Sequence, residues 1–540
     1  MRLSQARGSR MASVGGRQDG EARPGAAVGL DPALVDHLIR GHEQRASELE
    51  RFWAYYRNPA IHTTGVGADG LAKSIRRLAQ EEGLPARVTG GRIGVIGDDR
   101  YAERREVVIE NDIAWRVHAM IDFLFGKQPT IVSTAQSETT RELIDELVES
   151  AWKSSGGVEL LQDAALIGHV YGHVDLLLRV DEEALASFGR RAAKLRASGA
   201  SHHAMRGLMR QAGRAFRIEP VTPGRGIAVS DPSDYRALDG YVIHYEREAN
   251  EVERVGLVRK LAGRSRGEWG RRRRTETYTE VFGPGGRELW IGGELIERDD
   301  GGVLSGIVPV AHVQNMSQPL RYEGIGDVEP LIPLQDELNT RLSDRASRVT
   351  LQSFKMYLAK GIDGFDRMPV SPGTVWSTDN PEASVESFGG DAASPSEDRH
   401  IGEIRQALDK VSGVPPVASG VIEARVGNLT SANALRVTMV NLISRTNRKR
   451  VTYGRGMVEI SEMVLAAAGD SGLIETALGD RELKVEWPDP LPIGDDELAA
   501  SARVRRELGV PDDRIAEHFG IVPVGADSVD VGHEAIQEGK

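Results

Sequence analysis

Cysteine is absent from all 540 residues of the chain. A disulfide framework is therefore excluded, as are a cysteine-based zinc site and a cysteine nucleophile. The fold has to rest on packing alone, which fits assembly in a cytoplasm. Long apolar runs are absent as well. The best candidate for a membrane span, residues 164–180, is interrupted by polar side chains, so we expect no span. The interrupting residues are His169, His173, Asp175 and Arg179.

Nucleotide-binding and targeting signatures are also missing. No GxxxxGK[ST] phosphate loop occurs, so an ATP-driven step would need another protein. The segment GVGADG at 65–70 matches GxGxxG, but no apolar strand precedes it, which favours an ordinary glycine loop. The first 30 residues carry five arginines among Gly, Ser and Ala and no apolar centre. This composition predicts a disordered arm over 1–30 rather than a signal peptide.

The charge balance is acidic, with 68 Lys and Arg against 80 Asp and Glu and a formal charge of −12. Dedicated sequence-reading DNA binders usually carry a strongly basic domain, so the acidity argues against that class. A protein that DNA slides past is not excluded, because an acidic wall repels phosphates and prevents the counterion release that makes DNA stick. The length suggests roughly three or four domains.

Helical periodicity dominates the first 180 residues. Asp31 can cap a helix, Pro32 suits its first position, and apolar residues follow near a 3.6-residue period. The predicted helices cover 31–57, 107–125 (closed by Gly126), 138–154 and 158–167. The predicted strands cover 128–132 and 174–180, and a glycine-rich connection covers 64–97.

A basic insert over 182–217 separates this helical part from a β-rich part. Its alanine-rich spacing predicts one or two helices, and eight cations occur between Ala184 and Ile218 without an acid. These cations are Arg190, Arg191, Lys194, Arg196, Arg206, Arg210, Arg214 and Arg217. From 217 to about 313, turn signals separate short β-prone segments, which predicts an antiparallel β region. The run Arg271, Arg272, Arg273 and Arg274 falls in one of its loops.

The clearest predicted helix covers 324–354. Its apolar stripe steps by three and four residues, whereas the other face carries Glu337/Arg341 and Asp344/Arg348 at i,i+4. The stripe consists of Leu331, Leu334, Leu338, Leu342, Ala346 and Val349. Strands at 355–359 and 373–377, a Ser/Pro/Asp-rich loop at 391–398 and a helix at 401–411 follow. Beyond GVPP at 413–416 we expect a loop, a long helix over 430–468, a strand at 483–487 and helices at 495–508 and 512–519.

Five motifs carry a family resemblance through their order and spacing. They are IDFLFGKQP at 121–129, GDVEPLIPLQDELN at 326–339, KMYLAKG at 355–361, SGVP at 412–415 and NLTSANAL at 428–435. Together they resemble the portal family of tailed bacteriophages, in its siphophage-type branch. The resemblance implies an α+β portal fold with a helical stem, an α/β wing, a small β-containing clip and a helical crown.

The resemblance also implies a division of the chain. The wing would take 31–323, made of a helical part (31–180), the basic insert (182–217) and a β-rich part (218–323). The stem would take 324–354 and 400–412, with the clip at 355–399 between them. A tunnel loop would take 413–430, and the long helix at 431–468 would cross the wing. The crown would take 469–525, before a disordered tail at 526–540.

The function implied by the resemblance is a ring at one capsid vertex through which DNA enters and leaves. Such a ring would hold twelve copies of the chain and would serve packaging, head–tail connection and ejection. It would reside in the virion after assembly in the host cytoplasm. Its partners would be the terminase large subunit, a head–tail adaptor, major capsid and scaffold proteins, and double-stranded DNA passing without sequence specificity. No cofactor, metal or membrane is implied.

Specific residues follow from this interpretation. In the tunnel loop, the polar groups expected to face DNA are Ser419, Glu423, Arg425 and Asn428. Stem packing would use Leu331, Leu334, Leu338 and Leu342. Arg271–Arg274 and the basic insert could contact DNA or a protein partner, or simply be solvated. Arg445 and Arg448, with Lys449 and Arg450, could lie near the channel or form salt bridges between subunits.

Two other functions stay open at this point. His169 and His173 lie at i,i+4 and, with Asp175, could form a metal-dependent hydrolase site. A zincin would need Glu where Val170 stands, so buried or capping histidines are favoured. The second alternative is a structural adaptor that forms no ring. No acid–base dyad or nucleophile elbow stands out, which disfavours an enzyme.

Overall fold

The structure is a computed structural model, and it describes residues 23–66, 72–92, 101–102, 106–234, 237–248, 275–353, 356–361, 379–388, 394–420, 432–491, 495–509 and 515. Helices and sheets are mixed, and every strand pair within these residues is antiparallel, which confirms the α+β class. None of the described helices is both long and apolar enough to cross a bilayer.

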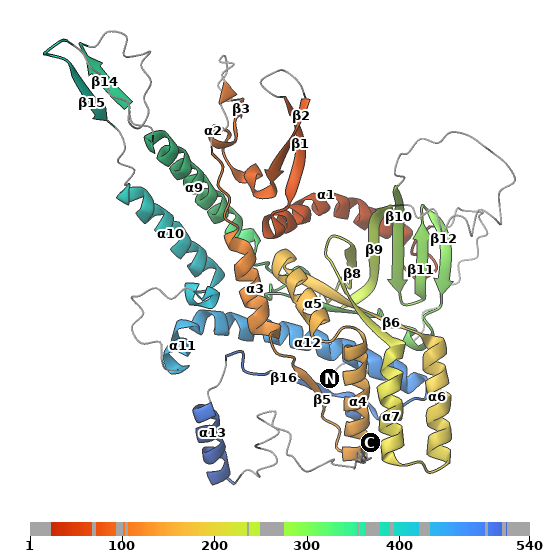
Figure 1. The fold of residues 1–540 in the computed structure, drawn as a ribbon. Helices are drawn as coiled ribbons and strands as arrows, with labels where there is room; N and C mark the ends of the chain where they lie inside the picture. Colours follow the sequence, from red (N-terminus) through yellow and green to blue (C-terminus); the bar gives the residue numbers. More distant parts are fainter. Residues whose placement is uncertain are drawn as a thin grey trace, which may run out of the picture.

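A three-stranded sheet lies at the centre of the body, in the order β13-β6-β7 (Figure 1). Its strands are β6 (His173–Val180), β7 (Phe216–Val221) and β13 (Val310–Gln314). Helices α3 (Asp112–Phe125), α5 (Val158–Tyr171) and α12 (Val440–Asp470) pack around it. The first six residues of β6 are all buried, because both faces are covered. Leu176 and Leu178 face the helical core, and Leu177 packs against β9 (Leu238–Glu248) and β10 (Thr275–Gly283) of a second sheet.

A second sheet has five strands in the order β12-β11-β10-β9-β8. They are β8 (Gly226–Ser230), β9 (Leu238–Glu248), β10 (Thr275–Gly283), β11 (Gly286–Ile291) and β12 (Glu294–Asp299). Helix α1 (Pro32–Arg57), capped by Asp31 as predicted, packs on it through Val35. Residues 23–30 also pack here, with Val28 fully buried and the backbone N–H of Gly25 donating to Glu288. The predicted disordered arm is therefore wrong for 23–30.

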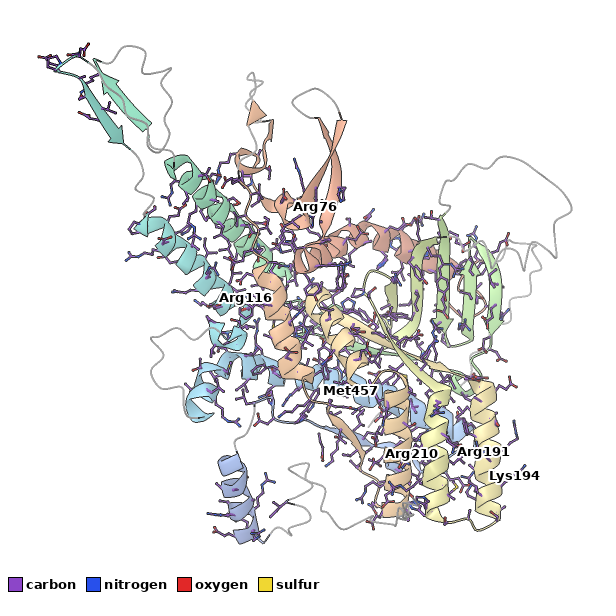
Figure 2. The ribbon with its side chains drawn as sticks, in the orientation of Figure 1. Arg76, Arg116, Arg191, Lys194, Arg210 and Met457 are labelled. Carbon is purple, nitrogen blue, oxygen red and sulfur yellow. The ribbon has the colours of Figure 1, made fainter. Side chains whose placement is uncertain are left out.

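The basic insert forms two helices, α6 (Glu182–Ala197) and α7 (His202–Ala212), followed by a short 3-10 turn, η2 (Gly213–Ala215). They line up with α4 (Glu138–Ser154), as Figure 1 shows. Arg206 and Arg210 form ion pairs with Glu146 on α4. The pKa of Glu146 is lowered, first by its hydrogen bond from Arg210. Arg191 and Lys194 are exposed along α6 (Figure 2).

Two helices project from the body toward a small hairpin (Figure 1). They are α9 (Ile332–Ser353), preceded by the 3-10 turn η4 (Glu329–Leu331), and α10 (Pro395–Ser412). The hairpin pairs β14 (Met356–Lys360) with β15 (Ser384–Phe388). The partner of β14 is therefore β15, which the sequence analysis missed, while the strand predicted at 373–377 lies outside the described residues. A 3-10 turn, η6 (Pro416–Ser419), follows α10.

The C-terminal part runs back through the body. Helix α11 (Ala432–Thr438) ends before Met439, and α12 begins directly after it. The single helix predicted over 430–468 is therefore two helices. The 3-10 turn η7 (Leu478–Arg481) leads to β16 (Leu483–Glu486), which pairs with β5 (Thr130–Ser133). Leu473 and Ile474 belong to the main hydrophobic core. Helix α13 (Asp495–Glu507) comes last among the described elements.

The predicted glycine-rich connection over 64–97 is wrong for most of its length. β1 (Ala60–Val66) and β2 (Ala72–Leu78) form a hairpin. It is followed by η1 (Ala79–Gly83), α2 (Ala86–Thr89) and the short pair β3 (Gly91–Arg92) and β4 (Tyr101–Ala102). A short 3-10 turn, η3 (Gly302–Leu304), occurs later in the chain.

Three predicted helix starts also need correction. α3 begins at Asp112 rather than 107, because the Asn111 side chain accepts from the backbone N–H of Ala114. The helix predicted from 324 begins with η4 at Glu329. α10 begins inside the predicted 391–398 loop, where Pro395 occupies its first turn and Glu397 and Asp398 complement the helix dipole.

Candidate functional site at the stem helices and the loop base

The projecting helices α9 and α10, here called the stem pair, share an apolar seam. Its buried members are Leu331, Leu338, Leu342, Ile401, Ile404 and Leu408, and Leu334 packs against them partly buried. Each full burial contributes about 1.5–3 kcal/mol. Three of the four predicted stem leucines are thus buried inside one chain. Packing of this stripe between chains stays a prediction.

Charged groups join the outer edges of the same pair. Arg345 contacts Asp398 at 3.2 Å, Arg348 contacts Glu397, and the His400 Nε2 lies 3.3 Å from Glu337. The predicted Glu337–Arg341 pair is formed at 2.7 Å. Because most of these groups are partly exposed, each such pair stabilises the fold by only about 0–1 kcal/mol and mainly fixes how the two helices align.

The flank of α9 beside the apolar seam carries a buried polar ladder. The Gln335 Oε1 accepts from the backbone N–H of Asp112, and the Asn339 Oδ1 accepts from that of Glu110, both at 3.0 Å. One turn further, the Ser343 Oγ accepts from the N–H of Val108 at 3.0 Å.

The regular spacing of this ladder arises because the rise of an α-helix over four residues nearly matches the rise of an extended chain over two residues. Four residues of helix rise about 6.0 Å, and two residues of extended chain span about 6.6 Å. Every fourth side chain of α9 therefore meets every second backbone group of 106–112. This pairing holds 106–111 extended, which explains why α3 starts late. The sequence analysis assigned no role to Gln335, Asn339 and Ser343.

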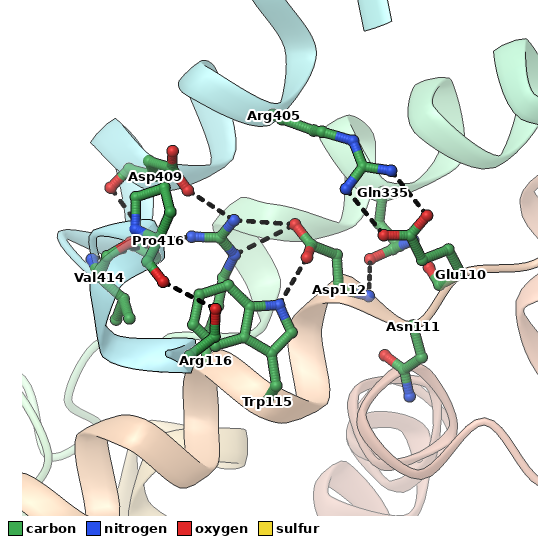
Figure 3. Close-up of polar contacts among 12 residues, drawn as sticks. Glu110, Asn111, Asp112, Trp115, Arg116, Gln335, Arg405, Asp409, Val414 and Pro416 are labelled. Atoms are coloured by element: carbon green, nitrogen blue, oxygen red, sulfur yellow. Dashed lines mark hydrogen bonds and ion pairs between the residues drawn. The ribbon is translucent and has the colours of Figure 1, made fainter. Parts of the chain in front are cut away.

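Arg116 joins α3 to the end of α10 (Figure 3). It is 2% exposed. Its Nε and Nη2 donate to the Asp112 Oδ2 at 3.2 and 2.9 Å. Its Nη2 also contacts the Asp409 Oδ1 at 2.7 Å. Its Nη1 donates to the Ser412 Oγ and the Val414 carbonyl oxygen, both at 3.1 Å. Five contacts thus serve the five N–H donors of one guanidinium.

This arrangement, here called the Arg116 knot, fixes where the chain leaves α10. Trp115 supports it, because its Nε1 donates to the Asp112 Oδ1 at 2.6 Å. Gly413 caps α10 with a φ of +71°, a conformation that glycine adopts without strain. A Cβ at Gly413 would lie 2.8 Å from the Arg445 Cδ, so the position also lacks room for a side chain.

The predicted tunnel-loop residues are only partly described. Ser419 is exposed at the end of η6, and its Oγ donates to the Pro416 carbonyl at 2.7 Å. Glu423, Arg425 and Asn428 lie outside the described residues, as do Arg271–Arg274. Their proposed contacts stay predictions.

The cations predicted on the long helix have different surroundings. Arg445 donates to the last carbonyls of α10, those of Val411 (2.8 Å) and Ser412. Arg450 donates to the Pro488 carbonyl at 2.7 Å, and Arg448 is exposed. Arg445 therefore stabilises the loop base from within the chain, and an intermolecular role for Arg448 stays a prediction.

Lys449 is buried and forms an ion pair with Asp327, Nζ to Oδ2 at 2.5 Å. The Asn315 Nδ2 donates to the same Oδ2 at 2.7 Å, which ties α12 to the segment before the stem. Burial lowers the pKa of Lys449, and the charge of Lys449 helps to hold the pKa of Asp327 low. The sequence analysis placed this lysine near the channel or between subunits; the structure pairs it inside its own chain.

The histidines of the hydrolase alternative do not form a shared site. The His169 Nδ1 lies 2.6 Å from the Ala165 carbonyl oxygen. Asp175 is engaged by Tyr241, Tyr322 and His312, each at 2.7 Å. Within the described part of the chain, no group of three or more His, Asp and Glu side chains could hold a metal ion. The geometry thus gives the hydrolase alternative no support.

The fold and this site define an α+β body from which two packed helices project, with the end of α10 held by the Arg116 knot. Sequence comparison then supplies the family. The profile described as "Phage portal protein, SPP1 Gp6-like" matches residues 35–513. The chain therefore belongs to the phage portal protein family.

Comparison with curated proteins finds no match. Among solved structures, similar chains include one from "Virion of native gene transfer agent (GTA) particle", at 12% identity and a TM-score of 0.38. Another is from "Neck of empty GTA particle computed with C6 symmetry", at 14% identity and a TM-score of 0.39. In both cases the match covers 76% of this chain and 90% of the other.

Proposed function

We propose that this chain is one subunit of a portal ring of twelve copies that forms a DNA channel at one capsid vertex. The ring would serve packaging, head–tail connection and DNA ejection. The observation that carries the proposal is the family match over 35–513. The ring would assemble in the host cytoplasm and reside in the virion.

The described elements supply parts that suit this function. The stem pair would follow the channel, with the β14–β15 hairpin in the clip at its tip. The Arg116 knot would fix the point where the tunnel loop, 413–430, departs. The wing would contain the two larger sheets and α12. Because β16 and Leu473 lie within the body, we place the start of the crown near α13.

The proposed loop would touch DNA without gripping it. Glu423 and Arg425 place opposite charges within it, so its net attraction to phosphate is small. Several uncompensated cations per subunit, repeated round a ring, would hold DNA strongly through counterion release. A sliding contact needs the opposite, which also fits a chain with a formal charge of −12.

The partners in this proposal are the terminase large subunit, a head–tail adaptor, major capsid and scaffold proteins, and double-stranded DNA without sequence specificity. The family is one of particle components, which supports a structural rather than a catalytic role.

Deleting 419–427 tests the channel proposal. We expect rings to form, because the Arg116 knot lies before the deletion, while DNA packaged per procapsid falls at least severalfold.

Glu423→Lys should slow packaging more at low salt than at high salt, since screening weakens the added attraction. Glu294→Lys, the same charge change on exposed β12, is the matched control. Wild-type packaging by both loop variants at every salt concentration would show that the loop does not touch DNA.

A further inference from the structure

Leu320 is the most exposed large hydrophobic side chain among those the structure describes, at 82%. Its φ is +62°, in the left-handed region that a bulky side chain rarely adopts. Such a conformation costs of order 1–3 kcal/mol and persists only where the surroundings impose it. Neither the strained backbone nor the exposed apolar side chain of Leu320 stabilises the chain to which it belongs.

Hydrogen bonds from buried side chains fix the turn that carries Leu320. Buried Gln314 donates through its Nε2 to the Arg321 and Tyr322 carbonyls, at 2.8 and 3.1 Å. The His312 Nε2 lies 2.6 Å from the same Tyr322 carbonyl. The Tyr322 hydroxyl donates to buried Asp175 at 2.7 Å. The base is therefore preorganised, and the tip, Leu320 with exposed Arg321, projects as a knob.

A complementary pocket lies beyond the C-terminal end of α12. It has a volume of about 420 Å³ and is lined by Gly469, Asp470, Ile474, Glu475, Thr476, Ala477 and Arg481. Ile474, which is nearly fully buried, Thr476 and Ala477 contribute its apolar carbons, and the side chains of Asp470 and Glu475 are open to solvent. No ion pair to Asp470 is found within the described residues. The pocket thus offers some apolar carbons beside a solvent-open carboxylate, with Arg481 in the same lining.

The knob has the matching chemistry, an apolar side chain beside a cation. At 82% exposure Leu320 does not fill the pocket of its own chain. A ring of identical subunits closes through contacts between two different patches of one chain, which a second copy brings together. We propose that Leu320 of one subunit enters the 469–481 pocket of the next, with Arg321 pairing with Asp470. This interface rests on the proposed portal ring and specifies one of its contacts.

The absence of cysteine makes a direct test clean. Leu320→Cys combined with Ala477→Cys should give a ladder of disulfide-linked multimers under mild oxidation of the assembled protein. The single variants should give dimers at most. Leu320→Cys with Glu294→Cys, an exposed position on β12, is the matched control. No ladder beyond that of the control pair overturns the proposal.

Charge reversal gives a second test that does not depend on the leucine. Arg321→Asp and Asp470→Arg should each lower the fraction of closed rings, measured by mass photometry, at least fivefold. The combined Arg321→Asp/Asp470→Arg variant should restore most of it. Only the backbone carbonyl of Arg321 is used within its own turn, so the single variants should fold. Equal ring fractions for all four proteins would overturn the pairing. If the unmodified protein forms no rings, that result contradicts the proposed portal function itself rather than this particular contact.

Discussion

Two buried cations anchor the chain on either side of the proposed tunnel loop, and they are satisfied differently. Arg116 holds the end of α10 before the loop through five contacts to four residues. Lys449 holds α12 after the loop through one ion pair with Asp327. Its other close contact is the Met120 sulfur at 3.6 Å, a weak acceptor.

The difference shows what each cation can do. A planar guanidinium presents five donors in a rigid fork, so Arg116 can join α3 to several groups at the end of α10, two segments that are distant in sequence. An ammonium is a compact point charge, so Lys449 depends on one carboxylate. The Asp327 Oδ1 has no hydrogen-bond partner among the described residues. The contacts around Arg116 therefore tolerate the loss of one member, whereas the Lys449–Asp327 ion pair does not.

The largest expected effect comes from breaking the second centre. Lys449→Met leaves Asp327 buried and unpaired, which should lower the free energy of unfolding by about 3–5 kcal/mol. The double variant Lys449→Met/Asp327→Asn removes both charges and should recover a large part of that loss. Urea unfolding at fixed protein concentration measures both. A double variant no more stable than Lys449→Met would show that the ion pair is not what stabilises this region.

A smaller effect should come from Arg116→Lys, which keeps the charge and loses the fork. We expect a loss of about 2–3 kcal/mol, because several buried acceptors lose their donors. We also expect faster proteolysis between 412 and 431, since the anchor of that segment is weakened. Arg405→Lys is the control, because Arg405 also donates two hydrogen bonds to one carboxylate, that of Glu110, but at a partly exposed position. Unchanged proteolysis in Arg116→Lys would mean that the knot does not hold the loop base.

The sequence predicted elements that local chemistry determines. Helix α4 begins and ends where predicted, because Ser137 caps it and its apolar residues keep a helical period. The two helices of the basic insert and the antiparallel β region were also predicted. These features depend on neighbours a few residues away, which a single sequence contains.

The features that were missed depend on partners far along the chain. Gln335 and Asn339 have the composition of a solvated face, and only the path of 106–112 beside them makes them buried ligands of backbone groups. Arg116 lies 296 residues from Ser412, so no spacing rule could pair them. The signal that was available is Asp112 and Arg116 at i,i+4 on an otherwise apolar helix, where charges must be paired.

The smallest expected difference between the Lys449 and Arg116 centres is in how the free energy of unfolding depends on pH. His169 lies in the Lys449 centre, where burial first, and then the charge of Lys449, lowers its pKa from 6.5 to about 3. Between these values the unfolded chain binds a proton that the folded chain does not, so stability is complete above pH 6.5 and falls as the pH decreases toward 3. Each such histidine contributes a slope of up to about 1.4 kcal/mol per pH unit. Buried His173, with a pKa lowered to about 4, adds a second contribution.

The measurement is the free energy of unfolding at pH 7, 6 and 5 for three variants. His169→Gln should reduce the slope by about 1 kcal/mol per pH unit, because its titrating group is gone. His203→Gln, at an exposed position on α7, should keep the slope of the unmodified protein. Arg116→Lys should be less stable at every pH with an unchanged slope, because the residues of the Arg116 knot include no histidine. If His169→Gln and the unmodified protein lose stability in parallel, burial of this imidazole does not cause the acid sensitivity.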